Sequence, residues 1–199
     1  MSKQVSDLDG NNVFDKLLSK RTLFLKDEID VNSATELIAN MLLLDAESNK
    51  EITLYINSVG GSVADGLFAI YDTMQMISSP IKTICLGQAF SSAAIILASG
   101  SPGMRFCSNH SSVMIHGLQI YDLSGDQKSI KREMSFNLNL NNLLMNILSK
   151  HCNQTLEKII QDCQEDKFLS PQEAINYGLV DHILPHNKPL KLPNGKKTK

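Results

Sequence analysis

The chain has 199 residues, of which 19 are basic and 21 acidic, so its formal net charge is only -2 at pH 7. With 42% hydrophobic and 20% charged residues, it has the composition of one globular domain rather than of a disordered chain. The longest apolar run, 93–98, is far shorter than the roughly 20 residues that cross a bilayer. Because the balanced charge also lacks the basic excess of a nucleic-acid-binding domain, we expect neither a membrane nor a nucleic-acid partner.

The cysteines and the first residues indicate a reducing compartment. The segment 1–12 is polar and lacks the apolar stretch of a secretory signal, which predicts a cytoplasmic location. None of the four cysteines has the spacing of a metal knuckle or a redox motif. We therefore expect reduced thiols that act as small core hydrophobes, at Cys85, Cys107, Cys152 and Cys163.

The first half of the chain alternates predicted strands with predicted helices. The strands are expected at 21–25, 52–57 and 81–86, and the helices at 33–47, 66–77 and 92–98. Ser33 is the expected N-cap of the first helix. Strands that alternate with helices in this way predict parallel βαβ units with right-handed crossovers, which places the chain in the α/β class.

The second half of the chain is dominated by one long predicted helix, about 128–152. A short strand at 113–116 precedes it, and no proline or glycine interrupts its apolar positions. A helix of this length would reach further than a compact domain of this size needs, so part of it is expected to project. Two helices at 156–162 and 171–177 and a strand at 179–184 follow, and the lysine-rich segment 186–199 is predicted to be a flexible tail.

Two turns could carry chemistry, because each follows the carboxyl end of a predicted strand, where open α/β sheets bind their ligands. In the first turn, Gly60 and Gly61 allow the backbone to approach a ligand closely, and their N–H groups could form an oxyanion hole. A tight connection between strand and helix explains a glycine pair equally well. The turn is not a phosphate loop, since no Gly-Lys-Ser or Gly-Lys-Thr follows.

The second turn presents Ser91 at the start of the 92–98 helix. Such a serine is either a nucleophile or a helix N-cap, and its neighbours do not form the Gly-x-Ser-x-Gly elbow of α/β-hydrolases. His116, at the end of the 113–116 strand, is the best placed of the five histidines to act as its base. An orienting acid could come from an acidic cluster, although spacing alone does not select one member of it: Asp162, Glu165 and Asp166.

Taken in this order, these segments resemble ClpP, the serine peptidase of the caseinolytic protease complexes. The matching segments lie at 54–62, 70–75, 83–89, 114–116 and 166–181, within a span of about 14–184. The resemblance implies a spiral of repeated βαβ units, of the ClpP and crotonase type, with a long projecting handle helix. It also implies three regions, namely a pore-loop segment at 1–13, a peptidase domain at 14–185 that includes the handle helix, and the tail at 186–199.

The resemblance also implies the chemistry, which is hydrolysis of peptide bonds by a serine endopeptidase. Position by position, Ser91 matches the nucleophile of the family, His116 its base and Asp166 its orienting acid. A backbone N–H of Gly60 or Gly61 would form the oxyanion hole together with that of Ser92. This route uses no metal and no cofactor in this chain.

The partners that the resemblance implies are further copies of the chain and a separate ATPase. Family members form two stacked rings of seven subunits that enclose the active sites, and their handle helices interdigitate. Four side chains would be buried there: Met134, Leu138, Leu144 and Ile147. A AAA+ unfoldase uses ATP, delivers unfolded polypeptides and docks in apolar clefts whose matching positions here are Tyr55, Met76, Ile84, Leu86, Phe106 and Leu184.

Several positions depart from the family pattern and keep alternatives open. Val59 replaces a proline before the glycine pair, Ser92 replaces a methionine, and the segment 117–125 after His116 differs from the usual Gln-Pro and glycine-rich stretch. One alternative is a weakly active structural paralogue in mixed rings. The other, a crotonase-type acyl-CoA enzyme, is disfavoured by the serine, histidine and aspartate set and by the long handle helix.

Overall fold

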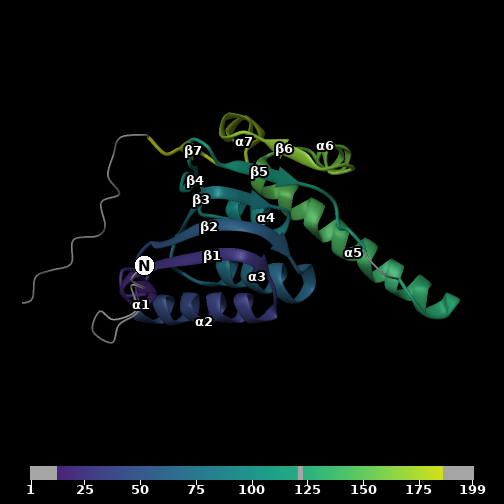
Figure 1. Cartoon of the computed structure of the whole chain (residues 1–199), viewed down its shortest axis with the longest axis horizontal. Coiled ribbons are helices and arrows are strands. Elements are labelled where there is room, and N and C mark those ends of the chain that lie inside the picture. Colours follow the sequence, from purple (N-terminus) through teal and green to yellow (C-terminus); the bar gives the residue numbers. More distant parts are fainter. Residues whose placement is uncertain (1–12, 121–122, 186–199) are drawn as a thin grey trace, which may run out of the picture.

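A seven-stranded sheet organises the computed structural model, which describes residues 13–120 and 123–185 (Figure 1). The parallel strands follow the order β1, β2, β3, β4 and β7. The strand β5 pairs with the carboxyl end of β3. β6 pairs antiparallel with β5. The bounds are Thr22–Ile29 for β1, Ile52–Gly61 for β2, Ile81–Phe90 for β3, Arg105–Cys107 for β4, Ser112–Ile115 for β5, Lys167–Leu169 for β6 and His182–Ile183 for β7.

Helices pack against the sheet and bury one apolar core. α4 contacts β2 and β3, while α2 contacts β1 and α3. Within the core, Leu25, Ile56, Met41 and Ile96 are at most 2% exposed. The helices are α1 at Val13–Leu18, α2 at Val31–Glu47, α3 at Phe68–Met76, α4 at Ser92–Ala98, α5 at Gln127–Cys152, α6 at Leu156–Asp162 and α7 at Pro171–Tyr177, and a π-helical turn, Val63–Leu67, precedes α3.

The predicted α/β class with its parallel βαβ units is confirmed, and the helices predicted at 92–98, 156–162 and 171–177 have those bounds. α1, β4 and β6 were not predicted, and only two residues of the strand expected at 179–184 are extended. A strand of two or three residues carries no periodic pattern and forms only because a partner strand is present. The predicted pore-loop segment, 1–13, and tail, 186–199, lie outside the described residues, except for Val13.

The N-cap of α2 is Asp30 and not Ser33, so that prediction is wrong by one helical turn. The Asp30 carboxylate accepts a hydrogen bond of 2.7 Å from the backbone N–H of Ser33, and the Ser33 hydroxyl accepts one of 2.9 Å from the N–H of Asp30. This reciprocal pair is a capping box in which Ser33 occupies the third helical position. The helix therefore begins at Val31.

α5 packs on the domain through its C-terminal half and extends beyond the rest of the molecule at its N-terminal half (Figure 1). Its buried residues all lie between Leu144 and Cys152. Leu144 is thus buried within its own chain and is not free to be buried between subunits, whereas Ile147 is only partly buried against the same core. The exposed apolar side chains of the projecting half are Met134, Phe136 and Leu138, and Leu143 is exposed in the C-terminal half.

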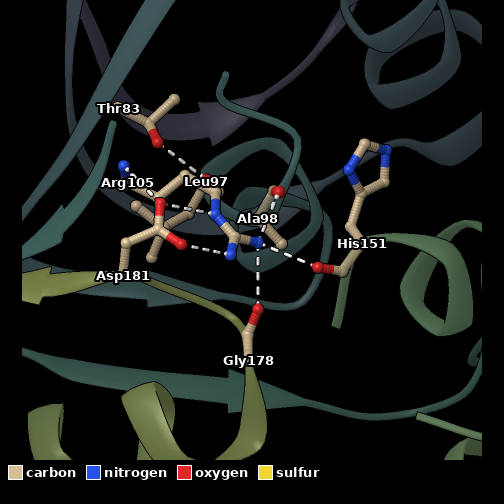
Figure 2. Close-up of polar contacts among 7 residues, drawn as sticks. All are labelled: Thr83, Leu97, Ala98, Arg105, His151, Gly178 and Asp181. Atoms are coloured by element: carbon tan, nitrogen blue, oxygen red, sulfur yellow. Dashed lines mark hydrogen bonds and ion pairs between the residues drawn. The ribbon is translucent and has the colours of Figure 1, made fainter. Parts of the chain in front are cut away.

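Arg105 on β4 joins three helix ends to the last strand (Figure 2). Its guanidinium donates to the carbonyl oxygens of Ala98 at the end of α4, His151 near the end of α5 and Gly178 after α7, at 2.9–3.2 Å. It also forms a two-pronged ion pair with Asp181, at 2.6 and 3.0 Å. Burial raises the pKa of Asp181, but the hydrogen bonds and charge of Arg105 outweigh this and hold that pKa below its ordinary value.

His151 makes the folded domain sensitive to acid. Burial, with the charges of Lys150 and Arg105, lowers the pKa of His151 from 6.5 to about 4, and its ring Nε2 lies 3.2 Å from the Tyr71 hydroxyl. Between these two pH values the unfolded chain binds a proton that the folded chain does not, so stability falls as pH falls. Because the ring is partly exposed, we expect the free energy of unfolding to fall by about 1–2 kcal/mol, which is less than the whole pKa shift would give.

Urea unfolding at pH 7 and pH 5 would measure this loss. His151→Gln keeps a hydrogen-bonding partner for Tyr71 and should flatten the dependence on pH, whereas His182→Gln, which removes an exposed imidazole, should leave it unchanged. An equally steep dependence in His151→Gln would show that other groups cause it.

Among the described helices, none is both long and apolar enough to cross a bilayer.

Candidate active site

Ser91 occupies a strained turn between β3 and α4. Its φ of 55° and ψ of -124° are unusual for a residue with a side chain. Such a backbone costs about 1–3 kcal/mol and persists only where the surroundings enforce it. Here the N–H of Ser91 donates to the carbonyl of Met114 on β5, at 2.8 Å, and α4 starts at the next residue. The turn therefore holds the hydroxyl-bearing residue at the end of a central strand.

The sheet brings Ser91, His116 and Asp166 to the same end. Phe90, directly before Ser91, pairs with Met114 of β5, and His116 directly follows β5. In the antiparallel pair of β5 and β6, Ile115 lies opposite Lys167. One further step in this register places His116 opposite Asp166, because antiparallel partners move in opposite directions along their strands.

The register places these three residues at one end of the sheet, but within the described residues no hydrogen bond joins their side chains. Nδ1 of the His116 ring lies 2.5 Å from the carbonyl oxygen of Gly117. Since a carbonyl oxygen only accepts, this contact requires the proton on Nδ1 and leaves Nε2 free to accept. Among the described residues, neither the Ser91 hydroxyl nor the exposed Asp166 carboxylate makes a side-chain hydrogen bond.

The glycine pair at the end of β2 packs directly against the Ser91 turn. A Cβ atom added to Gly60, whose φ is +91°, would lie 2.6 Å from the carbonyl oxygen of Phe90 and 2.8 Å from Cβ of Ser91. A Cβ on Gly61 would overlap the backbone of Ile29. Both turns were predicted to lie at the end of the sheet. In the structure the Gly60 turn also contacts the Ser91 turn, and only glycine permits so close an approach here.

The backbone N–H groups of the two glycines are not equivalent. The N–H of Gly60 donates to the buried hydroxyl of Ser58, at 3.1 Å, and that hydroxyl in turn donates to the carbonyl of Asp27. The hydroxyl of Ser92, a residue 2% exposed, donates to the carbonyl of Gly61 at 2.9 Å. Gly60 and Gly61 are the two candidate oxyanion-hole donors. Ser58 accepts from the N–H of Gly60 and not from that of Gly61. Ser58 had no sequence signal beyond its place beside the glycines.

A cavity of about 260 Å³ lies beside His116, between α5, the α6–β6 turn and the segment that follows His116. Its apolar lining comes from Leu118, Ile120, Leu138, Met145 and Ile160, and its polar lining includes Asn137, Asn141 and Gln164. Sequence reasoning did not find this cavity, because its walls come from segments that are distant in the chain.

Asp162 anchors β6, the strand that directly follows Asp166. Its carboxylate accepts from Lys158 at 2.7 Å, from Tyr177 at 2.9 Å and from Lys167 of β6 at 3.2 Å. Burial raises the pKa of Asp162, but these three donors outweigh it and lower that pKa overall. Asp162 is thus engaged with α7 and β6, whereas the Asp166 carboxylate is exposed.

The predicted docking positions fall partly on one row of the sheet. Tyr55, Ile84 and Phe106 are neighbours in register across β2, β3 and β4, and Phe24 extends the row with its ring centroid 5.4 Å from that of Tyr55. Ile84 is only 1% exposed, because it lies on the central strand between larger side chains, so it cannot itself present a surface.

The other three predicted docking positions lie apart from this row. Leu86 is 37% exposed near the middle of β3, Met76 is 69% exposed at the end of α3, and Leu184 directly follows β7.

The cysteines are not candidates for the chemistry. All four are buried, and burial raises the pKa of the Cys152 and Cys163 thiols to about 12. Within residues 13–120 and 123–185, no group of three or more histidine, cysteine or acidic side chains is arranged to hold a metal ion.

Comparison with known proteins gives one consistent result. A family model described as Clp protease matches residues 5–187. The ATP-dependent Clp protease proteolytic subunit of Carsonella ruddii (strain PV) is 38% identical over 175 residues, which cover 87% of this chain and 88% of that protein. The family model covers the turns at Gly60 and at Ser91, and it also covers β5, α5 and β6.

Proposed function

Because the chain belongs to the Clp protease family, we propose that it is a serine endopeptidase subunit in which Ser91 is the nucleophile, His116 the base and Asp166 the orienting acid. The observation that carries this proposal is the positive φ of Ser91, at a turn bonded to the strand that His116 follows. A capping serine needs no such strain, whereas an exposed nucleophile at a sharp turn between strand and helix does.

The proposed reaction is acyl transfer. The Ser91 hydroxyl oxygen attacks the carbonyl carbon of a peptide bond while Nε2 of His116 takes its proton, and the imidazolium then protonates the departing amine. Water deacylates the enzyme by the same steps in reverse, and His116 acts again as base. The N–H groups of Gly61 and Ser92 would hold the oxyanion, since Ser58 engages that of Gly60.

The cavity beside His116 supports an apolar side chain next to the cleaved bond. Leu118, Leu138 and Ile160 contribute to its lining, and a lining of this kind favours aliphatic or aromatic groups over charged ones. The proposed substrate is therefore an unfolded polypeptide with an apolar residue at that position.

We also propose the assembly of the family, two stacked rings of seven subunits, with a separate AAA+ ATPase docked on the outer face. The exposed apolar side chains of the projecting half of α5, Phe136 and Leu138 among them, support burial against another subunit. The aromatic row through Phe24, Tyr55 and Phe106 supports a docking surface, and the name of the Carsonella ruddii relative includes ATP dependence. Mixed rings and the cytoplasmic location stay predictions.

A fluorophosphonate probe tests the proposed nucleophile. We expect it to label the assembled wild-type protein on Ser91 and to leave Ser91→Ala unlabelled, because the probe reacts only with an activated serine. Ser92→Ala is the matched control, since it removes the neighbouring buried hydroxyl and should remain labelled. Assembled wild-type protein that takes up no label would favour the structural paralogue instead.

A further inference from the structure

The backbone directly after His116 is held on two sides by protein groups. The N–H of Gly117 donates to the carbonyl of Cys163 in the turn between α6 and β6, at 2.8 Å. The N–H of Leu118 donates to the side-chain oxygen of Asn141 on α5, also at 2.8 Å. Gly117 and Leu118 form part of the cavity wall, so these two bonds fix the position of that wall.

Asn141 lies where α5 meets the domain. The buried residues of α5 begin three positions later, at Leu144, and the residues before Asn141 belong to the projecting half. Its side chain is partly buried and lines the cavity, while its neighbour Asn142 is exposed. Asn141 is therefore a polar contact by which α5 holds the segment after His116.

Gly117 packs closely against both of these acceptor groups. A Cβ atom on Gly117 would lie 3.2 Å both from the Asn141 side-chain oxygen and from the Cys163 carbonyl oxygen, so the three groups are in close contact. The carbonyl of Gly117, on the same peptide unit as the N–H of Leu118, lies 2.5 Å from the His116 ring. The peptide unit that Asn141 holds thus adjoins the proposed base.

We propose that Asn141 is a positioning residue that fixes the Leu118 wall of the cavity and thereby sets the affinity of the active site for peptide. The inference rests on the proposed peptidase function. Without the amide oxygen, the Leu118 N–H loses its acceptor and the wall can move into the space that a substrate side chain would occupy. A residue that holds a binding wall affects KM, whereas one that touches the reacting atoms affects kcat.

The test measures binding apart from catalysis. The protein is the assembled chain with Ser91→Ala, and the ligand is a fluorescein-labelled peptide made of alanine and glycine with one leucine at its centre. Fluorescence anisotropy would give the Kd of this peptide. Asn141→Leu, which has similar size and no acceptor, should weaken binding about tenfold, in keeping with the loss of one buried hydrogen bond. Asn141→Asp keeps an acceptor for Leu118 and should bind within about twofold of the parent.

Two controls separate this role from a general effect on the helix. Asn142→Leu adds the same side chain to the exposed neighbouring position and should not change the Kd. With Ser91 intact, Asn141→Leu should raise KM for hydrolysis of the same peptide about tenfold and lower kcat by a clearly smaller factor. Unchanged binding in Asn141→Leu, or equally weak binding in Asn141→Asp, would overturn the inference. Failure of the proposed function would appear separately, as wild-type protein that the fluorophosphonate probe does not label.

Discussion

Asp166→Asn is expected to lower kcat/KM for peptide hydrolysis by about 10³- to 10⁴-fold. The carboxylate of a serine, histidine and aspartate triad holds the imidazole in the tautomer that accepts the serine proton and stabilises the imidazolium that forms. An asparagine at this position is nearly the same size, but it lacks the negative charge. Its side chain can also turn the NH2 group, which is a donor, toward the imidazole. Asp166 is exposed, so this substitution should cost little stability, and a fluorogenic peptide assay on assembled protein would measure the effect.

Glu165→Gln is the matched control for this prediction. Glu165 is also exposed and also acidic, but the register of β5 and β6 extends to Asp166 and not to Glu165 as the partner of His116. We expect Glu165→Gln to remain within about threefold of wild type, in keeping with the small effects of changing exposed charges.

The Asp166→Asn experiment also tests whether the Gly117 carbonyl alone is sufficient to orient the His116 ring. That oxygen already lies 2.5 Å from Nδ1 of His116, in the arrangement that leaves Nε2 free for Ser91. If the carbonyl alone were sufficient to orient the ring, Asp166→Asn would lose only about tenfold, and the role proposed for Asp166 would be contradicted. A loss of 10³-fold or more requires the charge, because a neutral carbonyl cannot stabilise the imidazolium to the same degree.

The architecture was predictable from the sequence where the signal is local. Apolar periodicity over many residues located α2 and α5, and the turn before the 92–98 helix placed Ser91 correctly. The short strands β4 and β6 were not predictable, since three residues have no period and extend only by pairing. Asp166 lies directly before β6, so spacing alone did not distinguish it from Asp162 and Glu165, and continuing the register of β5 and β6 by one step places it opposite His116.

The supporting contacts of the site were beyond sequence reasoning for a related reason. Asn141 and Leu118 are 23 residues apart, and Arg105 and Asp181 are 76 apart. An asparagine on a helix or an arginine on a short strand has no pattern that reveals its partner. Such contacts depend on tertiary structure, and the resemblance to a family predicts the reacting groups without predicting what holds them.

Arg105→Met is expected to destabilise the protein by about 3–5 kcal/mol. The arginine and aspartate side chains are only 12% and 18% exposed, so removal of the arginine leaves the Asp181 carboxylate with little access to water. The same change leaves the carbonyls of Ala98, His151 and Gly178 without their shared donor, and each lies near the negative end of a helix. Urea unfolding at pH 7 would measure the loss.

Three further variants separate the ion pair from the carbonyl contacts. Arg105→Lys should recover only part of the loss, because an ammonium cannot reach the carboxylate and three carbonyls in one plane. Asp181→Asn should cost less than Arg105→Met, because the guanidinium keeps its carbonyl partners. Arg132→Met, on the exposed half of α5, should change stability by less than about 0.5 kcal/mol.

The outcome also bears on the active site, because Arg105 holds the end of the helix that starts beside Ser91. α4 has seven residues, with Ser91 before its first residue and the Ala98 carbonyl bonded to Arg105 at its last. A strained turn is kept only while the structure around it is stable, so a weakened α4 should allow Ser91 to relax. We therefore expect Arg105→Met to lose fluorophosphonate labelling at a urea concentration below that of its own global unfolding. If labelling persisted until the variant unfolded, Arg105 would be a support of the fold that the active site does not need.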